Sequence, residues 1–373
     1  MRIVVAPDAF KGSATASQAA AAVAVGWRSV RPGDEILELP LADGGEGTLD
    51  VMSSARPGAV RHAVPVTGPD GRQVDACWLE LPDGTGVVEL AVASGLPLMD
   101  APNAGSATTA GVGELLEAAL DHGAHRLVLA LGGSASVDGG VGALTALGGR
   151  FLDARGRPLP PGGMALQELA TIDCGGLRPP PEGGVRCLVD VDSPLLGAHG
   201  AARVFGPQKG ASPDEVPQLD AGLARLAGCA SLLPTVAVTV TPETPGAGAA
   251  GGTAYGLGAL WGAALQSGAE SVAELAGLDE AVGAADVVIT GEGRFDATSL
   301  GGKVVGHVLA STPPGTRAAV VAGELAADPP DGVLGVELAA LAGGATASMA
   351  DPVRWLEVAG ASVASHLSPR SDP

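Results

Sequence analysis

Lysine is scarce in this chain of 373 residues, where 21 positions are lysine or arginine and only Lys11, Lys209 and Lys303 are lysine. Each of the three lies next to a glycine in the sequence, and glycine lets a backbone approach a ligand closely. A lysine ammonium is a compact charge that reaches phosphate oxygens without needing a planar, bidentate partner. We therefore expect the lysines to bind an anion. The alternative is chance placement in a chain that has 58 glycines.

Positive charge is scarce overall, and the formal net charge is −20. A field of that sign repels polyphosphates, which argues against a nucleic acid or an anionic membrane as partner. A small anion can still bind in a local positive pocket. Aromatic residues make up only 2% of the chain, so we expect a core of valine, leucine and alanine.

Paired cysteines and long apolar runs are also missing. The four cysteines form no CxxC pair and are expected to be reduced thiols: Cys77, Cys174, Cys187 and Cys229. No apolar stretch reaches the roughly 18 residues that a membrane span needs. The apolar run at residues 3–6 stops at Pro7, which predicts a strand rather than a signal peptide. We expect a cytoplasmic protein, and the oligomeric state is left open, a homodimer included.

Hydrophobic patterning alternates between short buried runs and longer helical segments, which predicts an α/β fold. Strands are expected at residues 3–6, 35–39, 126–131, 185–191, 235–240, 286–290, 317–322 and 333–338. Helices are expected at about 17–30, after 48, at about 108–121 and from about 301. Between 60 and 91 the period shifts toward two, with turn signals that indicate antiparallel hairpins. Residues 368–373 are expected to form a loose tail.

Several of these strands run into loops that combine glycine with carboxylates and hydroxyls. In open α/β sheets the carboxyl ends of the strands are where ligands bind, because helix N-termini and free backbone amides meet there. We therefore expect one shared cleft lined by carboxylates from these loops: Asp8, Asp43, Glu46, Asp138, Asp190, Asp192, Glu292 and Asp296. For Asp8 and Asp138 the alternative is a helix N-cap or an Asx-turn.

A GxGxxG pattern at residues 246–251 raises the alternative of an NAD-linked oxidoreductase acting on a hydroxy acid. A dinucleotide fingerprint needs the strand to enter the glycine turn directly. Here Pro242 and Pro245 separate the strand expected at 235–240 from the first glycine. We interpret the pattern as a chance match in a glycine-rich chain.

Six blocks of the sequence resemble the class I glycerate kinases, in that family's order and over nearly the whole chain. They are Ala-Pro-Asp-Ala-Phe-Lys-Gly-Ser at 6–13, Ala-Asp-Gly-Gly-Glu-Gly-Thr at 42–48, Gly-Gly-Ser-Ala-Ser-Val-Asp-Gly-Gly at 132–140, Val-Phe-Gly-Pro-Gln-Lys-Gly-Ala at 204–211, Pro-Gly-Ala-Gly-Ala-Ala-Gly-Gly at 245–252 and Thr-Gly-Glu-Gly-Arg-Phe-Asp at 290–296.

The resemblance implies ATP-dependent phosphorylation of D-glycerate with Mg²⁺, giving 2-phosphoglycerate rather than 3-phosphoglycerate. It also implies two α/β domains. A flavodoxin-like (Rossmann-like) domain would comprise residues 1–66 and 285–373, and a mixed α/β domain, residues 67–284, would be inserted in it. The active site is expected in the cleft between them.

The chain departs from the family at a few positions. The family usually has Ser at Ala9, Thr-Asn at Ser136-Val137, Thr-Asn at Asp192-Ser193 and Gln at Thr298. Valine at position 137 removes an amide that could contact substrate or phosphate. These changes keep open the alternative of a non-catalytic sensor of glycerate or nucleotide.

The resemblance and the residue chemistry together give the expected site. Phosphoryl transfer needs carboxylates for the metal, cations for phosphate oxygens and a base for the attacking hydroxyl. The residues expected to be catalytic are Asp190 as general base, Lys11 and Lys209. Glycerate is assigned to Asp8, Asp43, Ser134 and Arg294. The nucleotide is assigned to Gly132, Gly133, Gly291, Gly293 and Lys303.

Metal binding is assigned to Glu292 and Asp296, which are four residues apart in a segment expected to be a glycine loop. The alternative for these two carboxylates is a salt bridge with Arg294. The alternative for Asp190 is a buried, hydrogen-bonded aspartate. His122 and His125 lie near an expected helix end and are interpreted as capping residues rather than catalytic ones.

Overall fold

The structure is a computed structural model that describes residues 1–233, 240–301 and 303–367. The chain divides into two compact units. Unit 1 contains residues 1–43, 50–57 and 269–373, and unit 2 contains residues 44–49 and 58–268. The domain division expected at 66/67 and 284/285, with an active site between the domains, stays a prediction.

Unit 1 is built on a parallel sheet whose strands come from both ends of the chain. The strands are β1 (Arg2–Val5), β2 (Glu35–Glu38), β11 (Val287–Phe295), β12 (Arg317–Leu325) and β13 (Val333–Glu337). Their order, β2-β1-β11-β12-β13, is the 2-1-3-4-5 order of flavodoxin-like sheets. In such a sheet the strand order reverses between β1 and β11, and that reversal is where ligands bind.

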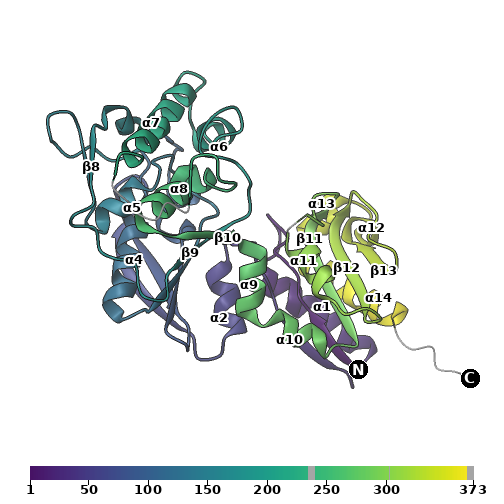
Figure 1. Ribbon diagram of the computed structural model, residues 1–373. Coiled ribbons are helices and arrows are strands. Elements are labelled where there is room, and N and C mark those ends of the chain that lie inside the picture. The colour runs from purple at the N-terminus through teal and green to yellow at the C-terminus, as the bar shows by residue number, and fades with distance from the viewer. Residues whose placement is uncertain (234–239, 302, 368–373) are drawn as a thin grey trace, which may run out of the picture. The chain divides into compact units, whose positions relative to one another are not determined.

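Helices from the two chain ends pack together in unit 1. Figure 1 shows α1 (Ala16–Val30) beside α14 (Pro352–His366). A Cβ on Gly26 of α1 would lie 1.9 Å from the Glu357 carbonyl oxygen, so glycine is what permits this close approach. Thr15 and Gln18 form a capping box that begins α1. The remaining helices are α2 (Thr48–Ala55), α9 (Gly268–Ala276), α10 (Leu278–Gly283), α11 (Val304–Ser311), α12 (Leu338–Ala342) and α13 (Ala345–Ala350).

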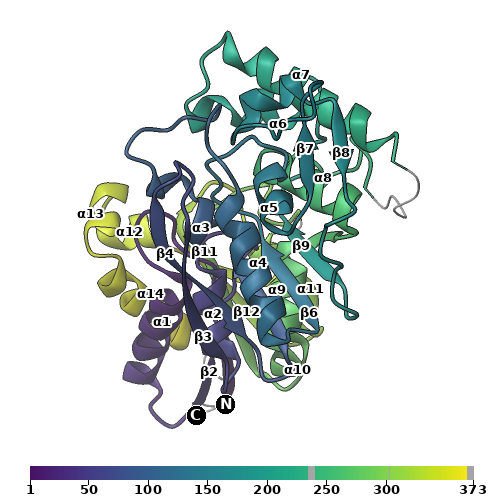
Figure 2. The ribbon, with the colours of Figure 1, turned by 90° about the vertical axis from the view of Figure 1, so that its left-hand side faces the viewer.

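Unit 2 is built on a mixed sheet with the order β10-β9-β6-β5-β4-β3. The strands are β3 (Val60–Thr67), β4 (Gln73–Glu80), β5 (Thr85–Glu89), β6 (Arg126–Ala130), β9 (Val185–Val189) and β10 (Ala264–Ser267). The hairpins β3–β4 and β4–β5 are antiparallel, and the other pairs are parallel. Helix α4 (Ala110–His122) packs against β3, β4 and β5 (Figure 2).

The other elements of unit 2 are shorter or lie outside this sheet. Strands β7 (Arg150–Leu152) and β8 (Thr171–Asp173) pair with each other. The helices are α3 (Ala91–Ser94), α5 (Val141–Ala146), α6 (Ala201–Phe205), α7 (Glu215–Ala230) and α8 (Ala249–Trp261), with 3-10 turns at Leu96–Leu98, Gly163–Glu168 and Pro207–Lys209. The core of the unit is mostly leucine, valine and alanine, as the scarcity of aromatic residues predicts.

The predicted α/β class is confirmed, and most of the expected strands and helices form within a few residues of their expected bounds. The segment 291–296 is an exception, because residues 291–295 continue strand β11 and pair with β12 instead of forming a loop. The strand expected at 235–240 falls almost wholly outside the described residues, and the tail expected at 368–373 does so entirely. Within the described part of the chain, no helix combines the length and apolar character that spanning a membrane requires.

Candidate active site

A pocket of about 460 Å³ opens at the carboxyl ends of β6 and β9 in unit 2. This is the edge of a parallel sheet at which ligand sites occur. The pocket contains five of the expected site residues: Gly132, Gly133, Ser134, Asp190 and Lys209. Its remaining lining is Glu46, Leu96, Pro97, Leu131, Leu188, Val189, Val191, Phe205, Gln208, Ala249 and Ala250.

Lys209 is a buried cation in this pocket, with only 3% of its surface exposed. Its Nζ donates to Ser134 Oγ at 2.5 Å and to the Ser136 carbonyl oxygen at 2.8 Å. Burial disfavours the charged ammonium and lowers the pKa of Lys209 to about 7, while the nearby Asp138 acts in the opposite direction. Lys209 can therefore gain or lose a proton near neutral pH.

Asp138 is buried, is not part of the pocket lining and has a structural role. Its carboxylate accepts hydrogen bonds from the Thr109 amide and hydroxyl and from the amides of Gly140 and Gly142. The last two bonds form an Asx-type turn that leads into α5, which is the alternative considered from the sequence. Burial raises the pKa of Asp138, and these hydrogen bonds oppose that effect.

The glycines after β6 are required by local packing. A Cβ on Gly132 would lie 2.4 Å from the Gly45 Cα, and Gly133 has a φ of +75°, which favours glycine. The Gly132 amide already donates to the Gly44 carbonyl oxygen at 3.3 Å. Both glycines line the pocket, as expected for a loop that approaches a phosphate, but the Gly132 amide has a protein partner.

Asp190 directly follows β9 and is an exposed residue of the pocket lining. The buried aspartate considered as an alternative is therefore not what the structure shows. Glu46, a carboxylate expected in the shared cleft but given no role of its own, also lines the pocket. Gln208 and Ala250 line it as well and were not expected. Gln208 stands directly before Lys209 in the block at 204–211, and that adjacency was the available sequence signal.

The glycines of the GxGxxG pattern also have packing roles. A Cβ on Gly248 would lie 2.3 Å from the Pro194 carbonyl oxygen, and one on Gly251 would lie 2.1 Å from the Ser136 carbonyl oxygen. Ala250, between them, has a φ of +52° and is the one non-glycine residue with positive φ among those described. The pattern therefore marks close backbone packing beside the pocket.

A second group of expected residues lies in unit 1, where β1 and β11 adjoin. The Asp8 amide donates to the Gly291 carbonyl oxygen at 2.8 Å, which joins the loop after β1 to β11. Burial raises the pKa of Asp8 to about 7, with further contributions from the negative charges of Asp43 and Glu292. Lys11 Nζ lies 3.5 Å from Asp43 Oδ2 and lowers the pKa of Asp8.

Glu292 contributes a buried carboxylate to this group. Its Oε1 has no hydrogen-bond partner among the residues that the structure describes. Burial raises the pKa of Glu292, while a hydrogen bond from Ser299 and the charges of Lys303 and Lys11 lower it. A buried oxygen without a partner is costly unless an ion or another donor satisfies it.

Asp296 and Arg294 have partners of their own. Asp296 Oδ1 accepts from the Thr298 amide and hydroxyl, and those bonds lower the pKa of Asp296. Arg294 pairs with Glu324 at 3.0 Å and with Asp296 at 3.8 Å, which is the salt bridge considered as the alternative to metal binding. Arg294 is thus engaged by two carboxylates in this structure.

The last three expected residues of unit 1 are Lys303, Gly291 and Gly293. Lys303 is the N-cap residue of α11, as expected, and its side chain is exposed. Gly291 and Gly293 belong to strand β11. A Cβ on Gly291 would lie 2.1 Å from the Val321 carbonyl oxygen, so that glycine is needed for contact with β12.

Comparison with known proteins extends these observations. The model of the Glycerate kinase family matches residues 3–367. The Glycerate 2-kinase of Escherichia coli (strain K12) is 44% identical over 308 residues, covering 82% of this chain and 80% of that protein. The Glycerate kinase of Bacillus subtilis (strain 168) is 45% identical over 307 residues, covering 81% and 79%.

A solved structure agrees with these relatives. The crystal structure of a glycerate kinase 2 candidate from Salmonella typhimurium LT2 matches with a TM-score of 0.84 and 36% identity, covering 98% of each chain. The matched part of the chain therefore spans both units. This chain belongs to the glycerate kinase family and is an enzyme of that family.

Proposed function

We propose that this enzyme transfers the γ-phosphoryl group of ATP directly to the 2-hydroxyl of D-glycerate, with Mg²⁺ as cofactor. The observation that carries the proposal is the buried Lys209 ammonium, hydrogen-bonded to Ser134 in a pocket lined by a glycine loop. The printed name of the Escherichia coli relative, Glycerate 2-kinase, supports the choice of hydroxyl.

In this proposal Lys209 binds the carboxylate of glycerate or the transferred phosphoryl group. A bound anion favours the ammonium form, which burial alone disfavours. Ser134 orients the ammonium and offers its hydroxyl to the same ligand. The compact lysine charge suits a phosphoryl group whose oxygens change geometry during transfer.

Asp190 acts as the general base that accepts the proton of the glycerate hydroxyl. It lines the same pocket as Lys209 and is exposed to an incoming substrate. A positioned base of this kind contributes roughly 10²–10⁴-fold to the rate. The proton moves from the hydroxyl to the Asp190 carboxylate as the oxygen attacks phosphorus.

The carboxylates of unit 1 fit a magnesium ion. Mg²⁺ prefers oxygen ligands, and Glu292 offers a buried oxygen that has no hydrogen-bond partner in the described part of the chain, near the carboxyl groups of Asp8 and Asp43. We assign Glu292 to the metal, with Asp296 as a further carboxylate that would have to share its oxygens with Thr298. When bound, Mg²⁺ neutralises charge on the phosphate oxygens.

The remaining cations are assigned to the anionic groups of the two substrates. Lys303, exposed at the N-cap of α11, is assigned to ATP phosphate together with Gly291 and Gly293. Lys11 is assigned to substrate carboxylate or phosphate, beside Asp8 and Asp43. Arg294 can clamp glycerate only if it leaves Glu324.

Two substitutions motivated the sensor alternative, at Val137 and Thr298, and neither residue is part of the pocket lining. Val137 is fully buried in the hydrophobic core of unit 2 and is not one of the lining residues. An asparagine amide at that position would need partners inside the core. The valine is therefore compatible with turnover.

The test is an assay of ADP release with Mg²⁺-ATP and D-glycerate, with L-glycerate as control. We expect turnover with D-glycerate that requires both Mg²⁺ and active protein. A folded sample that releases no ADP, while glycerate or ATP still raises its melting temperature, would contradict the proposal and favour a sensor.

A further inference from the structure

Two histidines and a glutamate of unit 2 converge at the edge of its sheet, away from the residues assigned to the reaction. In the antiparallel pair β3–β4, His62 is opposite Trp78 and Val60 is opposite Glu80. Residues two apart on a strand share a face, so His62, Trp78 and Glu80 lie on one face of the hairpin. Helix α4 packs on β3 and β4 and ends at His122.

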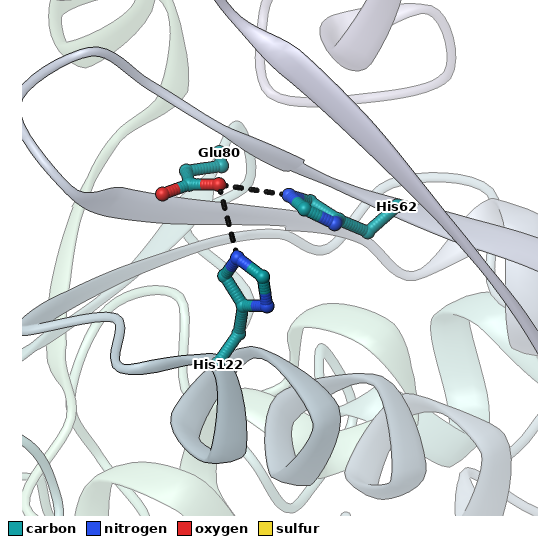
Figure 3. A group of neighbouring side chains, drawn as sticks. All are labelled: His62, Glu80 and His122. Atoms are coloured by element: carbon teal, nitrogen blue, oxygen red, sulfur yellow. Dashed lines mark hydrogen bonds and ion pairs between the residues drawn. The ribbon is translucent and has the colours of Figure 1, made fainter.

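These three side chains point toward one another (Figure 3). His62 Nε2 is 2.8 Å from Glu80 Oε2, and His122 Nε2 is 3.4 Å from the same oxygen. One nitrogen or oxygen atom from each residue lies within 4.8 Å of the other two. The pairing of β3 with β4 and the packing of α4 bring these residues near one another, but they do not require both imidazole nitrogens to approach the same Glu80 oxygen.

Trp78 holds the two imidazole rings in position. The His62 ring stacks on the Trp78 ring with centroids 4.3 Å apart and an interplanar angle of 14°. The His122 ring contacts the Trp78 edge at 5.6 Å and the His62 ring at 4.3 Å. Trp78 itself is buried, so it forms a rigid base for the donor atoms. Pre-positioned donors lose less conformational freedom when they bind a ligand.

We propose that His62, Glu80 and His122 form a binding site for a divalent zinc ion. Two imidazole nitrogens and one carboxylate oxygen form a donor set that zinc uses, with a fourth position open to water. Tetrahedral zinc with these ligands places donor atoms about 3.4 Å apart. The distances of 2.8 and 3.4 Å from Glu80 are close to that value, so small side-chain rotations suffice.

Without metal, Glu80 Oε2 is hydrogen-bonded to His62 Nε2 and lies at ion-pair distance from His122 Nε2. When zinc binds, these two nitrogens must offer lone pairs to the metal instead of carrying protons. The three side chains keep between 24% and 51% of their surface exposed, so an ion can enter from solvent. The hard, oxygen-preferring Mg²⁺ is disfavoured by a site with two imidazoles.

The site is structural in this proposal. Glu80 is paired near the beginning of β5, and His122 precedes β6, so the cluster lies at the amino ends of these parallel strands. The pocket with Lys209 follows the carboxyl ends of β6 and β9. Zinc therefore links the end of α4 to the edge hairpin β3–β4 and stabilises unit 2 without contacting the reacting groups.

The test measures zinc binding to the full chain by equilibrium dialysis with millimolar Mg²⁺ present, which occupies oxygen-only sites. The variants are His62→Gln and His122→Gln. The matched control is His366→Gln, because His366 is the final residue of α14, as His122 is the final residue of α4. Circular dichroism of each variant confirms that it is folded.

We expect one zinc per chain in the parent protein and in His366→Gln, with affinity at least about tenfold lower in each cluster variant. Zinc should raise the melting temperature of the parent and not that of His122→Gln, while ADP release by His122→Gln stays unchanged. X-ray absorption of the zinc-loaded protein should show imidazole ligands. Equal zinc affinity in His122→Gln and the parent, or no saturable binding, would overturn the proposal.

Discussion

Lys209 illustrates how a single residue takes its chemistry from its surroundings. A lysine in water has a pKa near 10.4, whereas burial lowers the pKa of Lys209 to about 7. Its Nζ donates to Ser134 and Ser136, and an anion bound beside it would favour the charged form. Proton binding at Lys209 and anion binding in the pocket should therefore be coupled.

At pH 8 we predict that D-glycerate binding is accompanied by proton uptake. Lys209 is mostly neutral at this pH, and the bound carboxylate raises its pKa toward the ordinary value. Calorimetric titrations in buffers of different ionisation enthalpy should show uptake approaching one proton. The uptake should disappear in Lys209→Met and persist in Arg150→Met, which removes an exposed cation of the same unit. Equal uptake in parent and Lys209→Met would contradict this assignment.

Asp190→Asn tests the proposed general base. The amide keeps the size of the side chain but cannot accept the hydroxyl proton, so kcat should fall by roughly 10²–10⁴-fold while the KM for glycerate changes little. The matched control is Asp192→Asn, two residues further along the chain and not among the pocket residues. A loss in Asp192→Asn as large as that in Asp190→Asn would argue against a specific base at 190.

At the scale of elements, α8 begins with an unusual backbone. Ala250, Gly251 and Gly252 have left-handed φ and ψ values within the first turn. Glycine tolerates that conformation, whereas an L-residue such as Ala250 incurs a cost of roughly 1–2 kcal/mol. Ala250 also lines the pocket, so this strained backbone shapes the binding surface.

Ala250→Gly should relieve that strain and raise the free energy of unfolding by up to about 1 kcal/mol, since part of the gain is lost to the greater freedom of glycine in the unfolded chain. Ala259→Gly, in the regular part of the same helix, should lower it by about 1 kcal/mol. Urea denaturation of both variants measures the two changes. If both variants were destabilised by the same amount, the proposed backbone strain at Ala250 would be contradicted.

The elements also show what local sequence can and cannot predict. Short apolar runs such as residues 126–131 and 185–191 identified β6 and β9, because buried parallel strands are almost wholly apolar. The continuation of β11 through residues 291–295 was missed. Glycines there suggested a loop, but pairing with β12, a contact distant in sequence, keeps the segment extended.

The sequence also predicted some residues of the candidate site and missed others. The glycine next to Lys209 and the position of Asp190 at the carboxyl end of β9 indicated that both residues belong to a ligand site. Both residues line the same pocket in the structure. The salt bridge of Arg294 with Asp296 was considered only as an alternative, and its pair with Glu324 was not anticipated, because Glu324 comes from the different strand β12. Glu46 was expected in the cleft from its glycine-rich loop, whereas Ala250 reaches the pocket through tertiary packing. The meeting of His62 with His122 depends on helix packing, which no local pattern encodes.

At the scale of the whole molecule, the net charge of −20 should affect stability. Like charges repel within the folded chain, and salt screens this repulsion over a Debye length of about 10 Å at 0.1 M. Raising potassium chloride from about 20 to about 200 mM at pH 7.5 should therefore raise the urea midpoint. Near pH 4.5, where the net charge approaches zero, the effect should nearly vanish. A midpoint that falls with salt at pH 7.5 would contradict this prediction.

Membership of the glycerate kinase family applies to the molecule as a whole, because the family model covers residues 3–367 and the solved relative covers both units. Our proposal is narrower, namely that this chain phosphorylates D-glycerate on its 2-hydroxyl. The most direct measurement is the ³¹P NMR spectrum of the product formed from Mg²⁺-ATP and D-glycerate. We predict a new phosphate monoester signal split into a doublet by the single proton on C2. A triplet, from the two protons on C3, would contradict the assigned hydroxyl, and the absence of any new phosphate signal would contradict the kinase activity itself.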